Sequence, residues 1–398
     1  MKKFILISII LVAIFKTESY SCTIIMVSDL KVILAGSNED STFPLTTLWF
    51  VPATDESYGR ICLGYKMMMN STQGGMNEKG LFLDGNSLSK QGWESDESKK
   101  ALFGSLLDRL LATCANIEEV KEFFNTYNIP ALDQARIPVM DRSGESMIVE
   151  WHNGKVIFLE TDKPYQIATN FVGSKYIGVE KPCWRYKKAN EMLQDKEAFS
   201  LNTVRDALDA THQESKYSST VYSFICDLQE GEIYVYNYYD FSKQISFKLK
   251  EELSKGYKEY YLSKLFTEKN EDYKKFISEG PANMIEFGYN RINKKTAMMF
   301  FGMLKFQYPT AFNRNIGINA LSQLGVRLTG EGKLEDAEMF LERNMSEFPD
   351  SARVHFELAN VYIKTNNKEL ALAEYKKTLA INPYHKQAKQ ALENLLHQ

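Results

Sequence analysis

The residue best suited to chemistry is Cys22, which follows a segment with the pattern of a secretory signal peptide, residues 1–21. A basic start precedes an unbroken apolar run over residues 4–15, and the polar stretch after it ends with the small residues Ser19 and Ser21. This small-x-small pattern predicts cleavage after Ser21. The apolar run is shorter than the roughly 20 residues that a membrane-spanning helix needs. We therefore expect a secreted or periplasmic protein with no membrane span, whose mature chain begins at Cys22.

An N-terminal Cys22 combines a nucleophile with its own base. A thiol reacts as the thiolate and has an ordinary pKa near ~8.5, whereas an α-amine has a pKa of about 7.7–8.0. The amine can therefore accept the thiol proton, as in other nucleophiles that are paired with an N-terminal amine. Two alternatives stay open. Cys22 could carry a lipid, although Ser19 stands where lipoprotein signals usually place leucine, or it could be an ordinary buried or disulfide-bonded cysteine.

Composition excludes several classes of function. The chain has 398 residues, 44% hydrophobic and 25% charged, which is typical of a globular protein of two or three domains. The net charge of −3 gives no sign of nucleic-acid binding. The five histidines lack metal-ligand spacing, so we expect neither a metal nor a cofactor. Five cysteines leave at least one thiol unpaired, and the four beyond Cys22 could form two bridges or stay as buried thiols.

The elements that must position Cys22 alternate between strands and helices over residues 22–250. Strands are predicted at 22–27, 32–35, 46–51, 60–67, 81–83, 137–140, 146–151, 155–160, 167–170, 221–227 and 232–236. The glycine-rich stretch 74–80 between two of these strands indicates a turn. Helical periodicity predicts helices at 99–114, 117–124, 184–193 and 201–211. This order predicts an α+β sandwich in which helices cover sheet layers.

The last part of the chain has a different organisation. Residues 251–280 are charged and rich in tyrosine at helical spacing, which predicts a helical connector. Residues 281–398 repeat a pattern of small and apolar residues, with Pro349 and Pro383 at equivalent positions. This pattern resembles tetratricopeptide repeats of 34 residues, with a capping helix at 388–396. We expect an all-α repeat domain that binds a protein partner or a second copy of the chain.

Several fragments of residues 22–250 occur in the order and approximate spacing of a known family. They are Cys22-Thr23, Gly36-Ser37-Asn38-Glu39-Asp40, Gln73 to Leu81, Ala168-Thr169-Asn170 and Trp184-Arg185-Tyr186. Together they resemble the linear amide C–N hydrolases, the superfamily of choloylglycine hydrolases and penicillin V acylases. The resemblance implies an N-terminal-nucleophile αββα sandwich and cleavage of a small N-acyl amide through a cysteine thioester.

The resemblance also assigns roles to individual residues. Cys22 matches the nucleophile, and Asp40 matches an acid that contacts the amine of the nucleophile. Asn170 matches an asparagine that touches the active centre, where we expect it to be one of the donors to the oxyanion, and Arg185 matches an arginine in a Ser-Arg-aromatic segment, here Trp184-Arg185-Tyr186. The simpler alternatives are a turn aspartate, a loop asparagine and a solvated helix arginine.

The donor to the oxyanion is ambiguous from the sequence. A gapless comparison puts Ser87 at the position of the family's asparagine, with Asn86 one residue earlier. We favour Asn86 because an amide is a better donor than a freely rotating hydroxyl. Many relatives have Gly-Arg-Asn where this chain has Gly36-Ser37-Asn38, which leaves the bile-salt substrate in doubt. Hydrolysis, transfer of the acyl group to an amine, and repeat-mediated binding on a degenerate amidase fold all remain compatible with the sequence.

Overall fold

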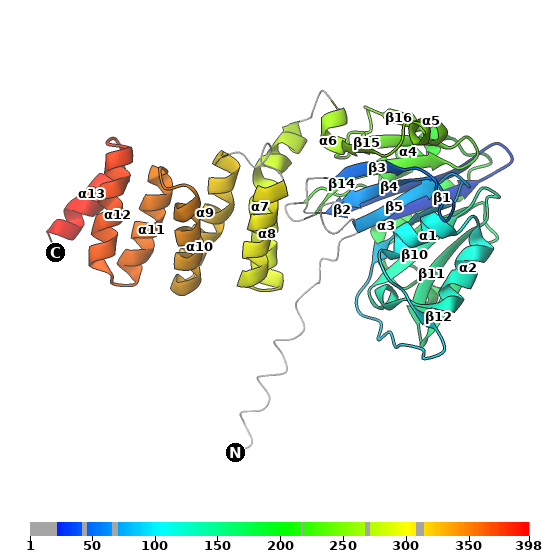
Figure 1. Cartoon of the computed structure of the whole chain (residues 1–398), viewed down its shortest axis with the longest axis horizontal. Coiled ribbons are helices and arrows are strands. Elements are labelled where there is room, and N and C mark those ends of the chain that lie inside the picture. The colour runs from blue at the N-terminus through cyan, green and yellow to red at the C-terminus, as the bar shows by residue number, and fades with distance from the viewer. Residues whose placement is uncertain are drawn as a thin grey trace, which may run out of the picture. The chain divides into compact units, whose positions relative to one another are not determined.

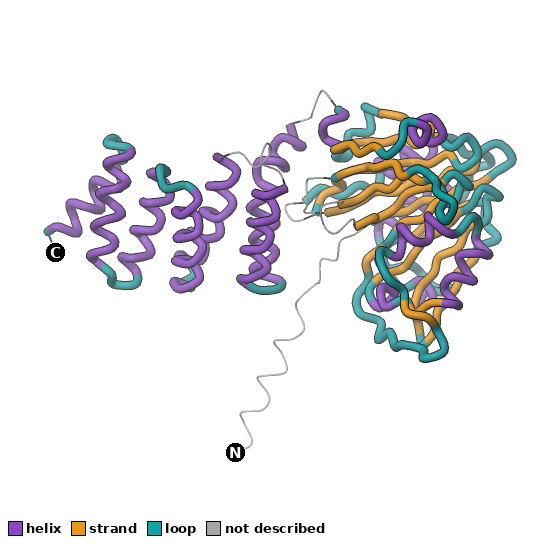
Figure 2. The backbone as a smooth tube through the Cα atoms, in the orientation of Figure 1, coloured by secondary structure: helices purple, strands orange, loops and turns teal. Residues whose placement is uncertain are grey.

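The computed structural model describes residues 22–41, 46–65, 71–215, 218–266, 271–307 and 314–397, so the expected signal segment, residues 1–21, lies outside the described residues. Apart from two short segments, the chain divides between Thr267 and Glu268 into two compact units. The first unit holds the two large sheets, and the second consists of helices (Figures 1 and 2). Among the helices of the described ranges, none is long and apolar enough to cross a bilayer.

The first large sheet carries the start of the mature chain that the sequence predicts. Its strand order is β13 (Tyr165–Ala168), β1 (Thr23–Ser28), β2 (Ile33–Ser41), β14 (Ser219–Asp227), β15 (Glu232–Asn237) and β16 (Ile245–Lys248). β1 and β2 form an antiparallel hairpin in which Ser28 pairs with Ile33 and Thr23 pairs with Asn38. β2 continues six residues beyond the predicted end at residue 35 and includes the whole motif from Gly36 to Asp40.

The second large sheet packs against the first. Its order is β12 (Lys155–Glu160), β11 (Ser146–His152), β10 (Ala135–Met140), β6 (Phe82–Asp84), β5 (Ser71–Asn77), β4 (Arg60–Tyr65), β3 (Thr47–Val51) and β17 (Lys258–Tyr261), and β7 (Asn86–Ser87) pairs with β10. The predicted turn at 74–80 is wrong for its first residues, because Gly74 and Gly75 lie within β5. A Cβ on Gly75 would come within 2.1 Å of the Ile61 carbonyl oxygen, so this glycine allows close strand approach rather than a turn.

Helices cover both outer faces of the paired sheets. α3 (Trp184–Leu193) and α4 (Leu201–Asp209) pack on the first sheet, and α1 (Leu106–Thr113) and α2 (Ile117–Thr126) pack on the second. Between the sheets, the centroids of the Phe82 and Phe224 rings lie 5.8 Å apart. The layers are thus helix, sheet, sheet, helix, which confirms the predicted αββα sandwich.

Two short elements accompany the helical layer of the second sheet. The predicted helix at 99–114 begins only at Leu106, because residues 100–101 form strand β8 (Lys100–Ala101), which pairs with β9 (Tyr127–Asn128). Gly104, with φ of +90°, separates β8 from the helix. The remaining short elements are 3-10 turns at Pro130–Asp133 and Gly173–Tyr176.

The predicted helical connector is wrong in its first half. Residues 249–266 form α5 (Leu249–Ser254), strand β17 (Lys258–Tyr261) and α6 (Leu262–Leu265). β17 pairs with β3 at the edge of the second sheet, with Tyr260 opposite Leu48. The Tyr260 ring packs edge-on against the Phe50 ring, with the ring centroids 6.3 Å apart. Tyr260 and Tyr261, which contributed to the helix prediction, therefore belong to a strand that extends the sheet.

The second unit is an array of antiparallel helix pairs. Its helices are α7 (Glu271–Arg291), α8 (Lys294–Gln307), α9 (Arg314–Gly330), α10 (Leu334–Glu347), α11 (Ala352–Lys364), α12 (Lys368–Ile381) and α13 (Lys386–Leu396). They follow one another side by side in chain order (Figure 1). The predicted start at residue 281 falls inside α7, which contains Pro281. A Cβ on Gly325 would come within 2.5 Å of Leu341, so a glycine at this position permits the close packing of α9 on α10.

Candidate active site

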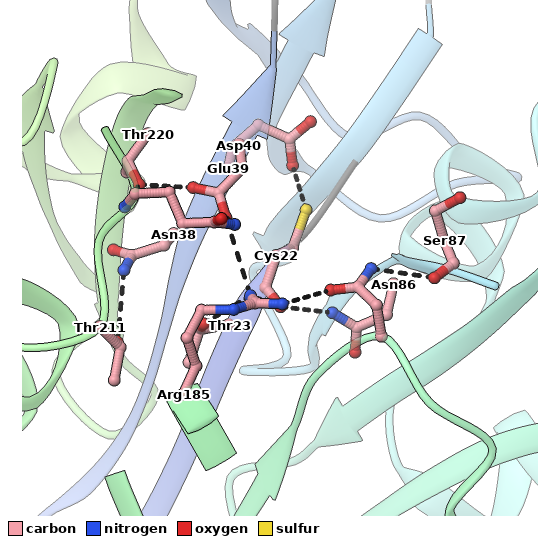
Figure 3. Close-up of polar contacts among 12 residues, drawn as sticks. Cys22, Thr23, Asn38, Glu39, Asp40, Asn86, Ser87, Arg185, Thr211 and Thr220 are labelled. Carbon is pink, nitrogen blue, oxygen red and sulfur yellow. Dashed lines mark hydrogen bonds and ion pairs between the residues drawn. The ribbon is translucent and has the colours of Figure 1, made fainter. Parts of the chain in front are cut away.

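Cys22 lies immediately before β1, where the first sheet faces the second. Its side chain is 4% exposed, and its thiol donates a hydrogen bond to Glu39 Oε2 at 3.3 Å. Figure 3 shows the opposite end of the residue, the carbonyl oxygen, turned toward Arg185 and Asn86. Cys22 is therefore held through its backbone on one side and contacts a carboxyl group through sulfur on the other.

Arg185 connects most of the residues that the sequence singled out. It lies in the first turn of α3 and is 4% exposed. Its Nη1 donates to the carbonyl oxygen of Cys22 at 2.8 Å and to Thr23 Oγ1 at 2.9 Å. Its Nη2 donates to Asn170 Oδ1 at 3.1 Å. A planar guanidinium suits this role because its donors are fixed relative to one another.

Asp40 lies on the face of β2 that points toward α3 and α4, opposite to the face that carries Glu39. Thr220 and Gln213 donate hydrogen bonds to its two carboxylate oxygens, and Arg185 Nη1 lies 3.7 Å from Oδ2. Burial raises the pKa of Asp40 to about 6, and Arg185 and the two hydrogen bonds oppose this increase. Asp40 therefore contacts Arg185, and Arg185 in turn donates to the Cys22 carbonyl oxygen.

Asn86, Ser87 and Asn170 lie next to one another on the other side of Cys22. Asn86 is fully buried, its Nδ2 donates to the Cys22 carbonyl oxygen at 3.2 Å, and its Oδ1 has no hydrogen-bond partner within the described part of the chain. Asn170 Nδ2 donates to the backbone oxygen of Ser87 at 2.9 Å. Of the two candidates for the oxyanion donor, Asn86 is the one whose amide contacts Cys22, whereas Ser87 contributes a backbone acceptor.

A buried ion pair supports the loop that carries Asn170. Arg136 Nη1 donates to the Phe171 carbonyl oxygen at 2.5 Å, and Arg136 Nε lies 3.6 Å from Glu150 Oε2. Glu150 in turn accepts hydrogen bonds from the backbone N–H groups of Gly173 at 2.9 Å and Ser174 at 2.7 Å. Sequence reasoning did not identify this pair, whose two members lie on adjacent strands of the second sheet.

Glu39 and Asp84 are two further residues near Cys22 that the sequence did not indicate. Both are buried, at 4% and 1% exposure, and Glu39 contacts the Cys22 thiol directly. Burial raises the pKa of Cys22, and the carboxyl groups of Glu39, Asp40 and Asp84 raise it further, while a hydrogen bond with the Asp40 backbone lowers it. Formation of the Cys22 thiolate therefore costs more free energy in this site than it does in water. In the described ranges, no three His, Cys, Asp or Glu side chains are arranged to hold a metal ion.

Comparison with protein families gives two matches. The model described as "Acyl-coenzyme A:6-aminopenicillanic acid acyl-transferase" matches residues 29–245, more than half of the chain. This range contains Asp40, Asn86, Asn170 and Arg185 and begins after Cys22. A tetratricopeptide-repeat model matches residues 328–396.

Solved structures with the same fold include two variants of the conjugated bile acid hydrolase from Clostridium perfringens. An arginine-to-leucine variant has a TM-score of 0.52 at 18% identity, over 63% of this chain and 99% of that chain. A cysteine-to-alanine mutant has a TM-score of 0.51 at 17% identity, over the same shares of the two chains, 63% and 99%. The penicillin V acylase from Agrobacterium tumefaciens gives 0.47 at 17% identity, over 60% of this chain and 90% of that chain. The search of curated protein sequences gave no match.

Proposed function

The chain belongs to the acyl-coenzyme A:6-aminopenicillanic acid acyl-transferase family, and from this premise we propose that it is an amidase that cleaves the linear carbon–nitrogen bond of a small N-acyl substrate. The observation that carries the proposal is the convergence on Cys22. Asn86 and Arg185 both donate to its carbonyl oxygen, and Arg185 links it to Asp40 and Asn170. We further propose that signal cleavage exports the protein and leaves Cys22 with a free α-amine.

The proposed reaction is acyl transfer through a thioester. The Cys22 thiolate attacks the amide carbonyl, and the Cys22 α-amine accepts the thiol proton. Asn86 donates to the developing oxyanion, a contribution that is typically worth about 10²–10³ in rate. Asn170 and Asp40 hold Arg185, which fixes the backbone of the nucleophile. The α-ammonium protonates the leaving amine, and water then hydrolyses the thioester.

A second candidate is transfer of the acyl group to an amine, which the description of the matched family favours. The chemistry up to the thioester is the same, and only the second acceptor differs. The C-terminal repeats are proposed to bind a protein partner or a second copy of the chain, because stacked helix pairs present an extended surface of this kind.

The test is release of amine from a panel of N-acyl amides, penicillin V, and glycine- and taurine-conjugated bile acids. Cys22→Ala should abolish release without unfolding the protein, because it removes only a small side chain. Cys183→Ser is the matched control, because Cys183 is partly exposed and stands at the N-cap of α3, a position that serine suits. Adding a primary amine as a competing acceptor distinguishes transfer from hydrolysis by the acylated product. A Cys22→Ala variant that keeps full turnover would refute the proposed nucleophile.

A further inference from the structure

Residues 171–184 form a loop whose two ends meet at the candidate active site. Asn170 precedes the loop and Arg185 follows it, and Arg185 Nη2 donates to Asn170 Oδ1 at 3.1 Å. Within the loop, the rings of Phe171 and Tyr176 pack edge-on, with their centroids 5.5 Å apart. A surface loop whose ends are close and which packs on its own side chains is an Ω-loop, a type that frequently carries function.

Two buried side chains fix the first part of this loop from below. Arg136 Nη1 donates to the Phe171 carbonyl oxygen at 2.5 Å. Glu150 accepts hydrogen bonds from the backbone N–H groups of Gly173 at 2.9 Å and Ser174 at 2.7 Å. The loop therefore leaves the sandwich in a direction that buried polar groups determine, and its tip does not depend on its own packing for its position.

The tip of the loop is a tight turn that presents apolar side chains to solvent. The Val179 N–H donates to the Tyr176 carbonyl oxygen at 3.4 Å, Ile177 has φ of −67° and ψ of 127°, and Gly178 has φ of +72°. These are the angles of a type II turn, with glycine where a positive φ is required. Ile177 is 70% exposed, Val179 is 59% exposed, and Trp184, the first residue of α3, is 56% exposed. We call these three residues the apolar tip.

Basic side chains surround the apolar tip. The lysines of segment 171–188, all exposed or partly exposed, are Lys175, Lys181, Lys187 and Lys188. Glu180 is the only acid in the sequence of this segment, and it pairs with Lys187. Because the buried Arg185 lies beside Asp40, the surface of the segment has four positive charges against one negative charge. The whole chain has a net charge of −3, so this surface is a local excess of positive charge.

This combination of side chains fits the surface of an anionic membrane. Exposed apolar groups with a polar rim mark sites of interaction with proteins or membranes. Tryptophan is enriched at the level of lipid headgroups, and lysines near the surface are attracted by anionic lipids. A second copy of the chain fits less well, because a two-fold contact would bring the same lysines against one another.

We propose that the apolar tip docks the protein on an anionic lipid surface, with the surrounding lysines against the headgroup phosphates. Because the loop begins and ends at residues that hold Cys22, docking brings the candidate active site to that surface. The substrates are then N-acyl amides whose acyl chains lie in the lipid. This assignment of substrates rests on the proposed amidase function, whereas the docking surface does not.

The experiment measures flotation of the full mature protein with vesicles. Vesicles of equal parts phosphatidylglycerol and phosphatidylcholine should bind it, and vesicles of phosphatidylcholine alone should bind it much less. Binding should weaken between about 0.1 M and about 0.5 M salt, because salt screens the lysines. Ile177→Ser/Val179→Ser should lower the affinity for the anionic vesicles by at least about 10-fold, because burial of one aliphatic side chain is typically worth a factor of about 10–100. Lys187→Gln/Lys188→Gln should also weaken binding.

Leu30→Ser is the matched control. Leu30 is a fully exposed aliphatic residue in the turn between β1 and β2, at the end of β1 opposite to Cys22. This variant should bind vesicles as the parent does. A second readout is tryptophan emission, because Trp184 is the most exposed of the four tryptophans. Anionic vesicles should shift the emission of the parent to shorter wavelength, and Trp184→Phe should lose most of this shift.

The binding outcomes test the docking surface by itself. Equal binding of the parent and Ile177→Ser/Val179→Ser, or equal binding to neutral and anionic vesicles, overturns it and leaves the amidase function standing. A parent that dimerises in solution and ignores vesicles, with a monomeric double variant, assigns the apolar tip to a second copy and also overturns it. A protein that binds anionic vesicles but cleaves no amide refutes the amidase function and leaves the docking surface standing.

The turnover outcomes test the assignment of substrates. The probe is the N-palmitoyl derivative of the amine that the amide panel identifies, incorporated in the anionic vesicles. The parent and Leu30→Ser should release this amine faster than Ile177→Ser/Val179→Ser does, by a factor similar to the loss of vesicle binding. Equal rates for the parent and the double variant, including no release by either, overturn the assignment of lipid-borne substrates.

Discussion

Replacement of Arg185 by methionine tests the arrangement of charges behind Cys22. Arg185 is 4% exposed, and its guanidinium donates to Cys22, Thr23 and Asn170 and lies 3.7 Å from the Asp40 carboxylate. Methionine has a comparable length and no charge, so Arg185→Met leaves Asp40 buried without its cation. Removing one partner of a buried ion pair typically costs about 3–5 kcal/mol, and we expect a loss of folding stability of this size at neutral pH.

The loss should depend on pH in a direction that follows from Asp40. Its pKa is about 6 in the folded protein, against about 3.9 in an unfolded chain. The folded state therefore binds this proton more tightly, so the contribution of Asp40 is fully present below about pH 3.9 and is lost as pH rises to about 6, by about 3 kcal/mol. Arg185 lowers the pKa of Asp40, so its removal extends this loss to higher pH. The variant should be destabilised more at about pH 8 than at about pH 5.

Tryptophan fluorescence provides a specific assay. All four tryptophans, Trp49, Trp93, Trp151 and Trp184, lie in the first unit, so denaturation followed by their emission reports on that unit and not on the repeats. Arg185→Lys keeps the charge and should lose less stability, while the double variant Arg185→Met/Asp40→Asn should recover part of the loss. Equal destabilisation at both pH values, with no recovery in the double variant, would refute the assigned coupling between Arg185 and Asp40.

Three further predictions follow from the same site and from the division into units. Intact mass of exported protein should correspond to a chain that begins at Cys22 without lipid, and a different start would remove the α-amine from the mechanism. Asn86→Ala should lower kcat by about 10²–10³, whereas Ser87→Ala should have little effect because Ser87 contributes its backbone oxygen; the reverse order would reassign the oxyanion donor. A chain that ends at Thr267 should keep the tryptophan emission of the full protein and cleave small amides at the same rate, and loss of the chemical step alone would show that a residue of the repeats takes part in catalysis.

The local pattern of the sequence predicts some elements together with their bounds. The segment Lys155–Glu160 and the helix Trp184–Leu193 have the predicted bounds. The errors arise where glycine or tyrosine has a role that depends on tertiary contacts. Gly75 permits two strands to approach, and Tyr260 packs against Phe50 across a sheet edge. Neither contact can be inferred from a window of sequence.

The candidate site was only partly accessible from the sequence for a similar reason. Arg185, Asn86 and Asp40 were identified through family motifs, and the structure places all three around Cys22. Glu39 was missed because the strand was predicted to end at residue 35, so alternation was not extended to it. The register of the hairpin could have revealed it, since a loop that pairs Ser28 with Ile33 also sets Cys22 opposite Glu39.

The alternation of a β-strand explains why neighbouring acids can have different roles here. Asp40 points toward the helical layer, where Arg185 and two hydrogen-bond donors stabilise its charged form. Glu39 points between the sheets, where a thiol, two tyrosines and another carboxyl group surround it. Successive side chains on a strand face opposite sides, so one residue of backbone separates an ionised acid from one whose charge is costly. Environments that push the pKa values of two acids apart are what proton transfer requires. A shift of one residue in the register of β2 would exchange the two acids, so the hairpin between β1 and β2 determines which carboxyl group faces the nucleophile.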